Sequence, residues 1–157
     1  MKFSCEKLLL QSAVATASRA VAAKSTIPAL EGVLLQTGNQ LTVSGYNMQT
    51  GIRTTLEADI TEEGALVLPA RLFGEIIRRL PDDVVTFASD KGMNVRLTCG
   101  DAAYNITALS AEDYPELPEV EDQYSLRIQQ QTLRSMIGET SFAVSAGEAR
   151  PIHTGSL

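Results

Sequence analysis

The alternation of apolar and polar positions predicts short strands separated by helices. Residues 2–6 place Phe3 and Cys5 on one side of an extended segment. In residues 7–22 the apolar positions instead follow the spacing of one helix face, and many of them are alanines that would allow close packing on a sheet. Three strands are predicted after this helix, over residues 33–37, 41–45 and 51–59.

The same order of elements then begins again. Residues 65–69 read as a strand, and residues 70–80 as an amphipathic helix bounded by Pro69 and Pro81. Three more strands are predicted, over residues 84–89, 93–99 and 103–109. Residues 1–110 therefore read as two βαβββ units, and we expect an α+β fold with helices packed on antiparallel sheets.

A third copy of the pattern begins after an acidic segment with two prolines, residues 110–123, which reads as a linker. A strand over 124–128 and a helix over 129–142 are predicted, with Ser156-Leu157 opening the next strand. With an offset of 123 positions and no gaps, nine of 34 residues match the N-terminal segment, where chance gives about two. We expect one domain over residues 1–121 and the start of a similar one over 122–157; coincidence between two α/β openings is the alternative.

Charge is distributed unevenly along the chain, whose formal net charge is −6. Residues 7–24 hold three basic side chains and no acidic one, and residues 70–80 hold three basic side chains against Glu75. Basic helices on an acidic protein can attract phosphate groups on one face while the other surfaces repel them. The simpler interpretation is that lysine and arginine favour helices and are solvated there.

Residues that would support catalysis are scarce. His153 is the only histidine, and no glycine-rich nucleotide-binding loop or metal-ligand spacing is present. Cys5 and Cys99 lie in strand-like runs and read as small buried apolar residues. We therefore expect no enzyme, cofactor or metal. The absence of an 18-residue apolar run and of a signal-peptide pattern argues against a membrane partner and for a cytoplasmic protein.

Several phrases of the chain carry a family resemblance. They are the N-terminal run over residues 1–35, LPARLFGEIIRRLP over 68–81, ITALSAEDYPELP over 106–118 and RPIHTG over 150–155. On these residues the chain resembles the bacterial β sliding clamps, the processivity subunits of DNA polymerase III.

The resemblance implies the clamp fold and a DNA-binding function without catalysis. Such protomers have three similar domains, and two of them close head to tail into a homodimeric ring whose helices face duplex DNA. The implied partners are double-stranded DNA, the catalytic subunit of DNA polymerase III and the clamp loader. The alternative function is a protein-interaction module that binds the clamp loader or polymerase without encircling DNA.

Candidate site residues follow from the same resemblance. Lys24 and Arg150 match basic positions that face DNA, and weaker candidates, chosen by helix position and charge, are Lys7, Arg19, Arg78, Arg79 and Arg134. Gly147 falls where some clamps have a polar DNA-contacting side chain. The rim that meets the partner protomer is matched by Arg71, Leu72, Phe73, Tyr104 and Ile106.

His153 lies where clamps border the groove for partner peptides; an ordinary loop histidine is the alternative. The chain is shorter than a three-domain protomer, so the resemblance implies a fragment that cannot form the standard ring. We expect its amphipathic helix over 129–142 to pack on a neighbour or to exchange with another copy, because so short a segment buries little core.

Overall fold

A computed structural model describes residues 1–118, 125–147 and 150–156. The chain divides into two compact units, Met1–Pro118 and Glu119–Leu157. The predicted domain boundary between residues 121 and 122 lies outside the described residues. Each unit is considered by itself below.

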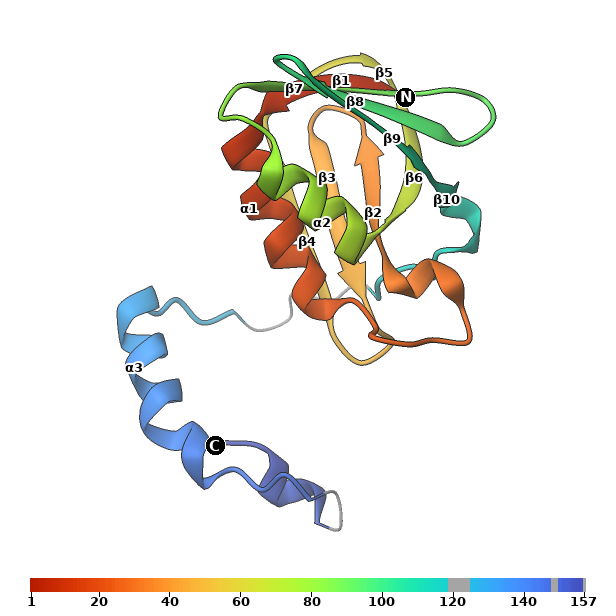
Figure 1. Ribbon diagram of the computed structural model, residues 1–157. Helices are drawn as coiled ribbons and strands as arrows, with labels where there is room; N and C mark the ends of the chain where they lie inside the picture. The colour runs from red at the N-terminus through yellow and green to blue at the C-terminus, as the bar shows by residue number, and fades with distance from the viewer. Residues whose placement is uncertain (119–124, 148–149, 157) are drawn as a thin grey trace. The chain divides into compact units, whose positions relative to one another are not determined.

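The strands of the first unit form two five-stranded antiparallel sheets (Figure 1). Sheet A has the order β5-β1-β7-β8-β9, with bounds β1 Lys2–Glu6, β5 Asp59–Glu62, β7 Val84–Ser89, β8 Asn94–Cys99 and β9 Ala102–Thr107. Sheet B has the order β10-β6-β2-β3-β4, with bounds β2 Gly32–Thr37, β3 Leu41–Tyr46, β4 Gly51–Leu56, β6 Gly64–Pro69 and β10 Leu109–Ser110.

The two predicted βαβββ units exchange their first strands. β1 pairs with β7 over its whole length, from Lys2 opposite Ala88 to Glu6 opposite Val84. In the same way β6, the first strand of the second unit, pairs with β2 of the first. The edge strands β5 and β10 follow the exchanged strands into the same sheets. β5 pairs with β1 in sheet A, and β10 pairs with β6 in sheet B. The duplicated units are therefore interlocked, and neither has a complete sheet of its own.

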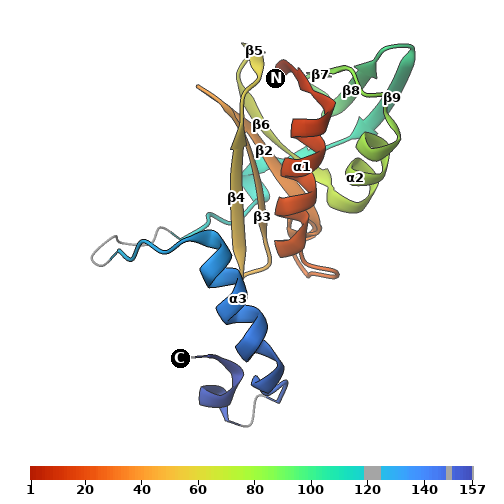
Figure 2. The same ribbon diagram turned by 90° about the vertical axis from the view of Figure 1, so that its left-hand side faces the viewer.

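Helices α1 (Lys7–Ala17) and α2 (Ala70–Arg79) lie side by side on one face of sheet B, as both views show (Figures 1 and 2). α1 covers β3 and β4, and α2 covers β2 and β6. The predicted helix over 7–22 is too long, because α1 gives way at Ser18 to a 3₁₀ turn and Val21 is extended. That turn lies against β3, where Gly45 passes close to the carbonyl group of Ala17.

One hydrophobic core fills the space between both sheets and the helices. Phe3 and Phe87 stack there with ring centroids 4.7 Å apart. A second cluster lies on the other face of sheet B around Leu34, Val67 and Tyr114. Burial of both faces explains why β2 and β6 carry continuous apolar runs, because strands covered on both sides need no polar alternation.

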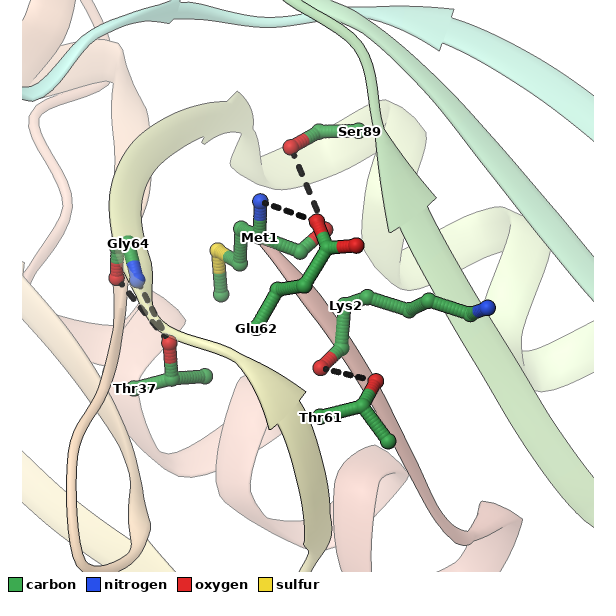
Figure 3. Close-up of polar contacts among 7 residues, drawn as sticks. All are labelled: Met1, Lys2, Thr37, Thr61, Glu62, Gly64 and Ser89. Carbon is green, nitrogen blue, oxygen red and sulfur yellow. Dashed lines mark hydrogen bonds and ion pairs between the residues drawn. The ribbon is translucent and has the colours of Figure 1, made fainter.

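The chain crosses from sheet B to sheet A between β4 and β5, so the single strand predicted over 51–59 is wrong. Figure 3 shows how β5 is held: Thr61 donates a hydrogen bond to the carbonyl of Lys2 at 3.2 Å, and the amino group of Met1 lies 3.8 Å from Glu62. At the following turn, Gly64 N donates to Thr37 Oγ1 at 2.8 Å. These contacts fix the turn that leads into β6.

The segment predicted as a linker belongs in part to the first unit. Ser110 lies in β10, and Tyr114 is buried in the second cluster, where its hydroxyl donates to the carbonyl of Ser44 at 3.5 Å. Leu117 packs against Gly51 at the start of β4. Residues 119–123 lie outside the described residues. Apolar side chains therefore anchor this acidic stretch up to Pro118.

The second unit contains α3 (Gln130–Thr140) and two 3₁₀ turns, Ser141–Ala143 and Pro151–Thr154. The predicted strand over 124–128 is wrong for residues 125–128, and Ser156 is not in a strand; residues 124 and 157 lie outside the description. A strand requires a hydrogen-bonding partner, and the described residues of this unit supply none. The apolar side chains of α3 are about half exposed, at 44% to 55%: Leu133, Met136 and Ile137.

Candidate nucleic-acid interface

The helix-pair surface, defined as the exposed residues of 7–24 and 70–80, carries four basic side chains without an ion-pair partner among the described residues: Arg19, Lys24, Arg78 and Arg79. Arg19 and Lys24 follow the end of α1, and Arg78 and Arg79 close α2. α1 and α2 run in opposite directions, because the first residue of α1 contacts the loop after α2. The two basic groups therefore lie at opposite ends of the helix pair.

Local sequence explains why the α2 arginines point outward. Phe73 and Ile77 are fully buried on the opposite side of the helix, and Leu80 follows at 4% exposure. Arg78 and Arg79 occupy the last turn, where positive charge is stabilised by the partial negative charge of the helix C-terminus. The amphipathic pattern thus orients a basic group toward solvent at no cost to the core.

Lys7, one of the DNA-contact candidates, forms an ion pair within the first unit. Its Nζ lies 2.7 Å from Asp82 Oδ1, and its side chain is only 10% exposed. Its backbone N–H also donates to the carbonyl of Asp83 at 3.1 Å. Lys7 therefore joins the start of α1 to the loop after α2, and its contact with DNA stays a prediction.

Arg71 and Glu75 form the other ion pair of this surface, with Nε and Oε1 3.4 Å apart. The Arg71 side chain is 94% exposed and that of Glu75 is 43% exposed. Glu75 is also the only acidic residue in the segments 7–24 and 70–80. Positive charge on the helix pair is therefore partly offset at one position.

Two shallow hollows open on the helix side of the unit. One, of about 290 Å³, lies between the helices and is lined by Gln11, Ala15 and Gly74 with Arg71 and Arg78. A larger one, of about 800 Å³, is mainly apolar and lies beyond the end of α1. Ser18 lines both hollows, and each also holds one carboxylate, that of Glu31 in the larger hollow and that of Glu75 in the smaller one.

The thiols are as the sequence predicted. Cys5 and Cys99 are both free and buried. Burial raises the pKa of the Cys5 thiol to about 12. Such a thiol remains protonated and is a poor nucleophile and metal ligand. In the part of the chain that the structure describes, no group of three potential ligands could hold a metal, and no helix is long and apolar enough to cross a membrane.

The predicted protomer-contact residues divide into two kinds. Arg71 and Leu72 are exposed on α2, and Tyr104 is partly buried. The side chains of Phe73 and Ile106 instead lie in the core, at 0% and 4% exposure, and their contact with a partner protomer stays a prediction. β9 itself is an edge strand of sheet A, and its ladder partner among the described residues is β8.

The candidates of the second unit are all exposed: Arg134, Arg150 and His153. The carbonyl of His153 accepts a hydrogen bond from Ser145 N at 2.8 Å, and its own N–H donates to the carbonyl of Arg150 at 3.0 Å. Gly147 N donates to Ser145 Oγ at 3.1 Å. The contacts within this unit are local, so the roles predicted for these residues stay predictions.

Comparison with known proteins agrees with this geometry. The family model for the DNA polymerase III beta subunit, N-terminal domain, matches residues 1–118. The chain belongs to this family. Beta sliding clamps of Synechococcus elongatus and Bacillus subtilis are 34% and 32% identical to it, each over 99% of this chain. Family membership thereby confirms the α+β clamp fold that was predicted for this chain.

Solved structures extend the likeness beyond the first unit. A putative DNA polymerase III beta subunit from Eubacterium rectale aligns with a TM-score of 0.94 and 33% identity, over 99% of this chain and 43% of that one. The Bacillus subtilis sliding clamp aligns with a TM-score of 0.91 and 30% identity. The chain spans only 42% and 43% of the two clamp sequences above, so the activity of a whole clamp enters below as a proposal.

Sequence reasoning missed both acidic partners on the helix pair. The Arg71–Glu75 contact has the i, i+4 spacing of a helix pair, so periodicity could have revealed it. Lys7 and Asp82 are 75 positions apart, and no local pattern connects them. Only the packing of α1 beside α2 brings these two residues together.

Proposed function

We propose that this chain is part of a sliding clamp, which encircles duplex DNA without reading its sequence and tethers the replicative polymerase to it. The observation that carries the proposal is the location of charge in the first unit. Four basic residues of the helix-pair surface have no ion-pair partner among the described residues, whereas Glu75 is the one acidic residue in its segments 7–24 and 70–80. Phosphate attraction on one face supports binding that is independent of sequence.

The open sheet edges support assembly into a ring. Duplication makes β4 and β9 equivalent, and each pairs on only one side, β4 with β3 and β9 with β8. An unpaired strand edge can continue its ladder into another chain. We propose that β9, together with Leu72 and Tyr104 of the predicted rim, meets the partner protomer of a head-to-tail homodimer.

The remaining parts of the proposal follow from family membership. The clamp has no catalytic activity and acts in the cytoplasm, where the catalytic subunit of DNA polymerase III and the clamp loader are its partners. Arg134 and Arg150 contribute DNA contacts from the second domain, and His153 borders the groove for partner peptides. The names of the relatives, which are beta sliding clamps, support this reading.

The test is topological and uses the whole protein that contains this chain. The clamp is loaded on nicked circular DNA, and its retention is measured before and after the circle is linearised. We expect retention on the circle and rapid loss from the linear product. Equal retention on both would favour the alternative, a module that binds the loader or polymerase without encircling DNA.

A charge test examines the helix pair directly. Replacing both Arg78 and Arg79 with Gln should weaken retention and reduce its salt dependence by about two phosphate contacts. The matched control replaces two exposed basic residues away from the helices with Gln: Lys91 in the turn between β7 and β8, and Arg96 in β8. Equal losses in the two double variants would contradict DNA contact by the helix pair.

A further inference from the structure

Two acidic residues engage basic residues beside the helix pair, and they do so in different settings. Asp82 pairs with Lys7, whose side chain is only 10% exposed. Glu75 pairs with Arg71, whose side chain is 94% exposed. Removing Asp82 would leave a poorly hydrated ammonium group without a partner, whereas removing Glu75 would leave a fully hydrated guanidinium.

Helix stability does not account for the Arg71–Glu75 pair. Exposed i, i+4 pairs contribute little, and the order with the acidic residue first is the more favourable one. Here the order is reversed, because Arg71 is the second residue of α2 and Glu75 follows a turn later. Arg71 therefore puts positive charge at the helix N-terminus, which the macrodipole disfavours.

The position of the pair suggests a role on the binding surface itself. Arg71 and Glu75 line the hollow between the helices together with Arg78. Arg71 lies at the same end of the helix pair as Ser18, because both residues line the same hollows beside α1. A carboxylate there occupies the nearest guanidinium, which is then less available to a phosphate group.

We propose that Glu75 limits the affinity of the helix-pair surface for DNA by holding the Arg71 guanidinium, which would otherwise contact phosphate. This inference rests on the proposed function and adds a regulating residue to it. A clamp that slides has to keep its phosphate contacts weak. Glu75 acts through Arg71 and is a positioning residue, while Arg19, Lys24, Arg78 and Arg79 supply the attraction.

The test measures affinity of the 157-residue chain for a short DNA duplex by fluorescence anisotropy over a range of salt concentrations. Glu75→Gln should raise affinity about fivefold at low salt, the effect of one unit charge at contact distance in water. It should also steepen the slope of log K against log salt by about 0.9, because one more cation contacts phosphate. Glu75→Asp, which keeps the charge, should keep the original slope.

Matched variants separate this role from a general change in charge. Glu63→Gln changes net charge equally but lies in the turn between β5 and β6, so its slope should stay unchanged. Arg71→Gln combined with Glu75→Gln should restore the original slope, because the released cation is then absent. Asp82→Asn should lower the unfolding midpoint without steepening the slope, because Lys7 stays buried.

Two results would overturn the inference: equal gains in Glu75→Gln and Glu63→Gln, or a gain that persists when Arg71 is also replaced. Either result leaves the proposed clamp function standing if the unsubstituted chain binds DNA in a salt-dependent way. Absence of salt-dependent binding in both the unsubstituted chain and Glu75→Gln would contradict the inference and the DNA-facing role of the helix pair. Thermal unfolding of each variant confirms that the surface being compared is folded.

Discussion

Replacement by alanine should have opposite effects on stability at two glycines of the first unit. Gly45 lies in β3 beneath the end of α1, where an added Cβ would overlap the carbonyl oxygen of Ala17 and lie 2.8 Å from its carbonyl carbon. Gly74 lies in α2, where an added Cβ would meet no atom within 4 Å. Replacing each by alanine therefore tests whether α1 and β3 approach as closely as the structure shows.

The expected change in the free energy of unfolding depends on whether the atoms around the new methyl group can move. At Gly45 the obstacle is backbone, so either the end of α1 or β3 has to shift, and the penalty lies at the upper end of overpacking, about 3 kcal/mol. At Gly74 the new methyl group enters open space, and alanine restricts the unfolded chain. Gly74→Ala should therefore stabilise the unit by about 0.5–1 kcal/mol.

Urea unfolding followed by far-ultraviolet circular dichroism measures both changes. With a slope of about 1–3 kcal/mol per molar urea, Gly45→Ala should lower the midpoint by about 1 M or more, and Gly74→Ala should raise it by a few tenths. Equal slopes for the variants would show that the same surface is exposed on unfolding. A Gly45→Ala protein as stable as the parent would refute the close contact of α1 with β3.

Three further predictions concern buried groups and the second unit. Asp82→Asn should lower the free energy of unfolding by about 1–2 kcal/mol because it leaves the Lys7 ammonium unpaired, whereas Lys7→Met should change it by less than about 1 kcal/mol; equal losses in urea unfolding would contradict this. Burial raises the pKa of Cys5 from 9.0 and of Tyr114 from 10.0, each to about 12. The unfolded chain therefore loses these protons first, so stability should fall as pH rises from about 9 to 12, and Cys5→Ala with Tyr114→Phe should flatten that fall. Analytical ultracentrifugation should show the 157-residue chain self-associating through the exposed apolar face of α3, and a strict monomer at high concentration would contradict this.

Periodicity located most elements of the first unit because each has a clear buried side. β7 has the predicted bounds, and α2 ends one residue before its predicted end. The prediction failed between residues 51 and 62, because an apolar–polar alternation does not record a change of sheet. It also failed at residues 125–128, where strand-like composition had no partner strand.

The candidate interface was only partly predictable. Helix position and charge identified Arg19, Arg78 and Arg79, the resemblance identified Lys24, and the structure leaves all four exposed. The same reasoning selected Lys7, because charge along a sequence does not show which side chain meets a partner after folding. Phe73 and Ile106 were chosen by resemblance, and the structure places both side chains in the core.

The sequence by itself determined the order of strands and helices, the repetition of that order and the clustering of basic residues within the segments 7–24 and 70–80. These properties depend on residue type and on spacing along the chain. Only the tertiary structure decided that β1 belongs beside β7 and β6 beside β2, and that Lys7 is neutralised by Asp82. Strand pairing and burial are non-local, because they depend on which distant segments share a core. A repeated order of strands and helices can therefore indicate two units without showing that each unit completes the sheet of the other.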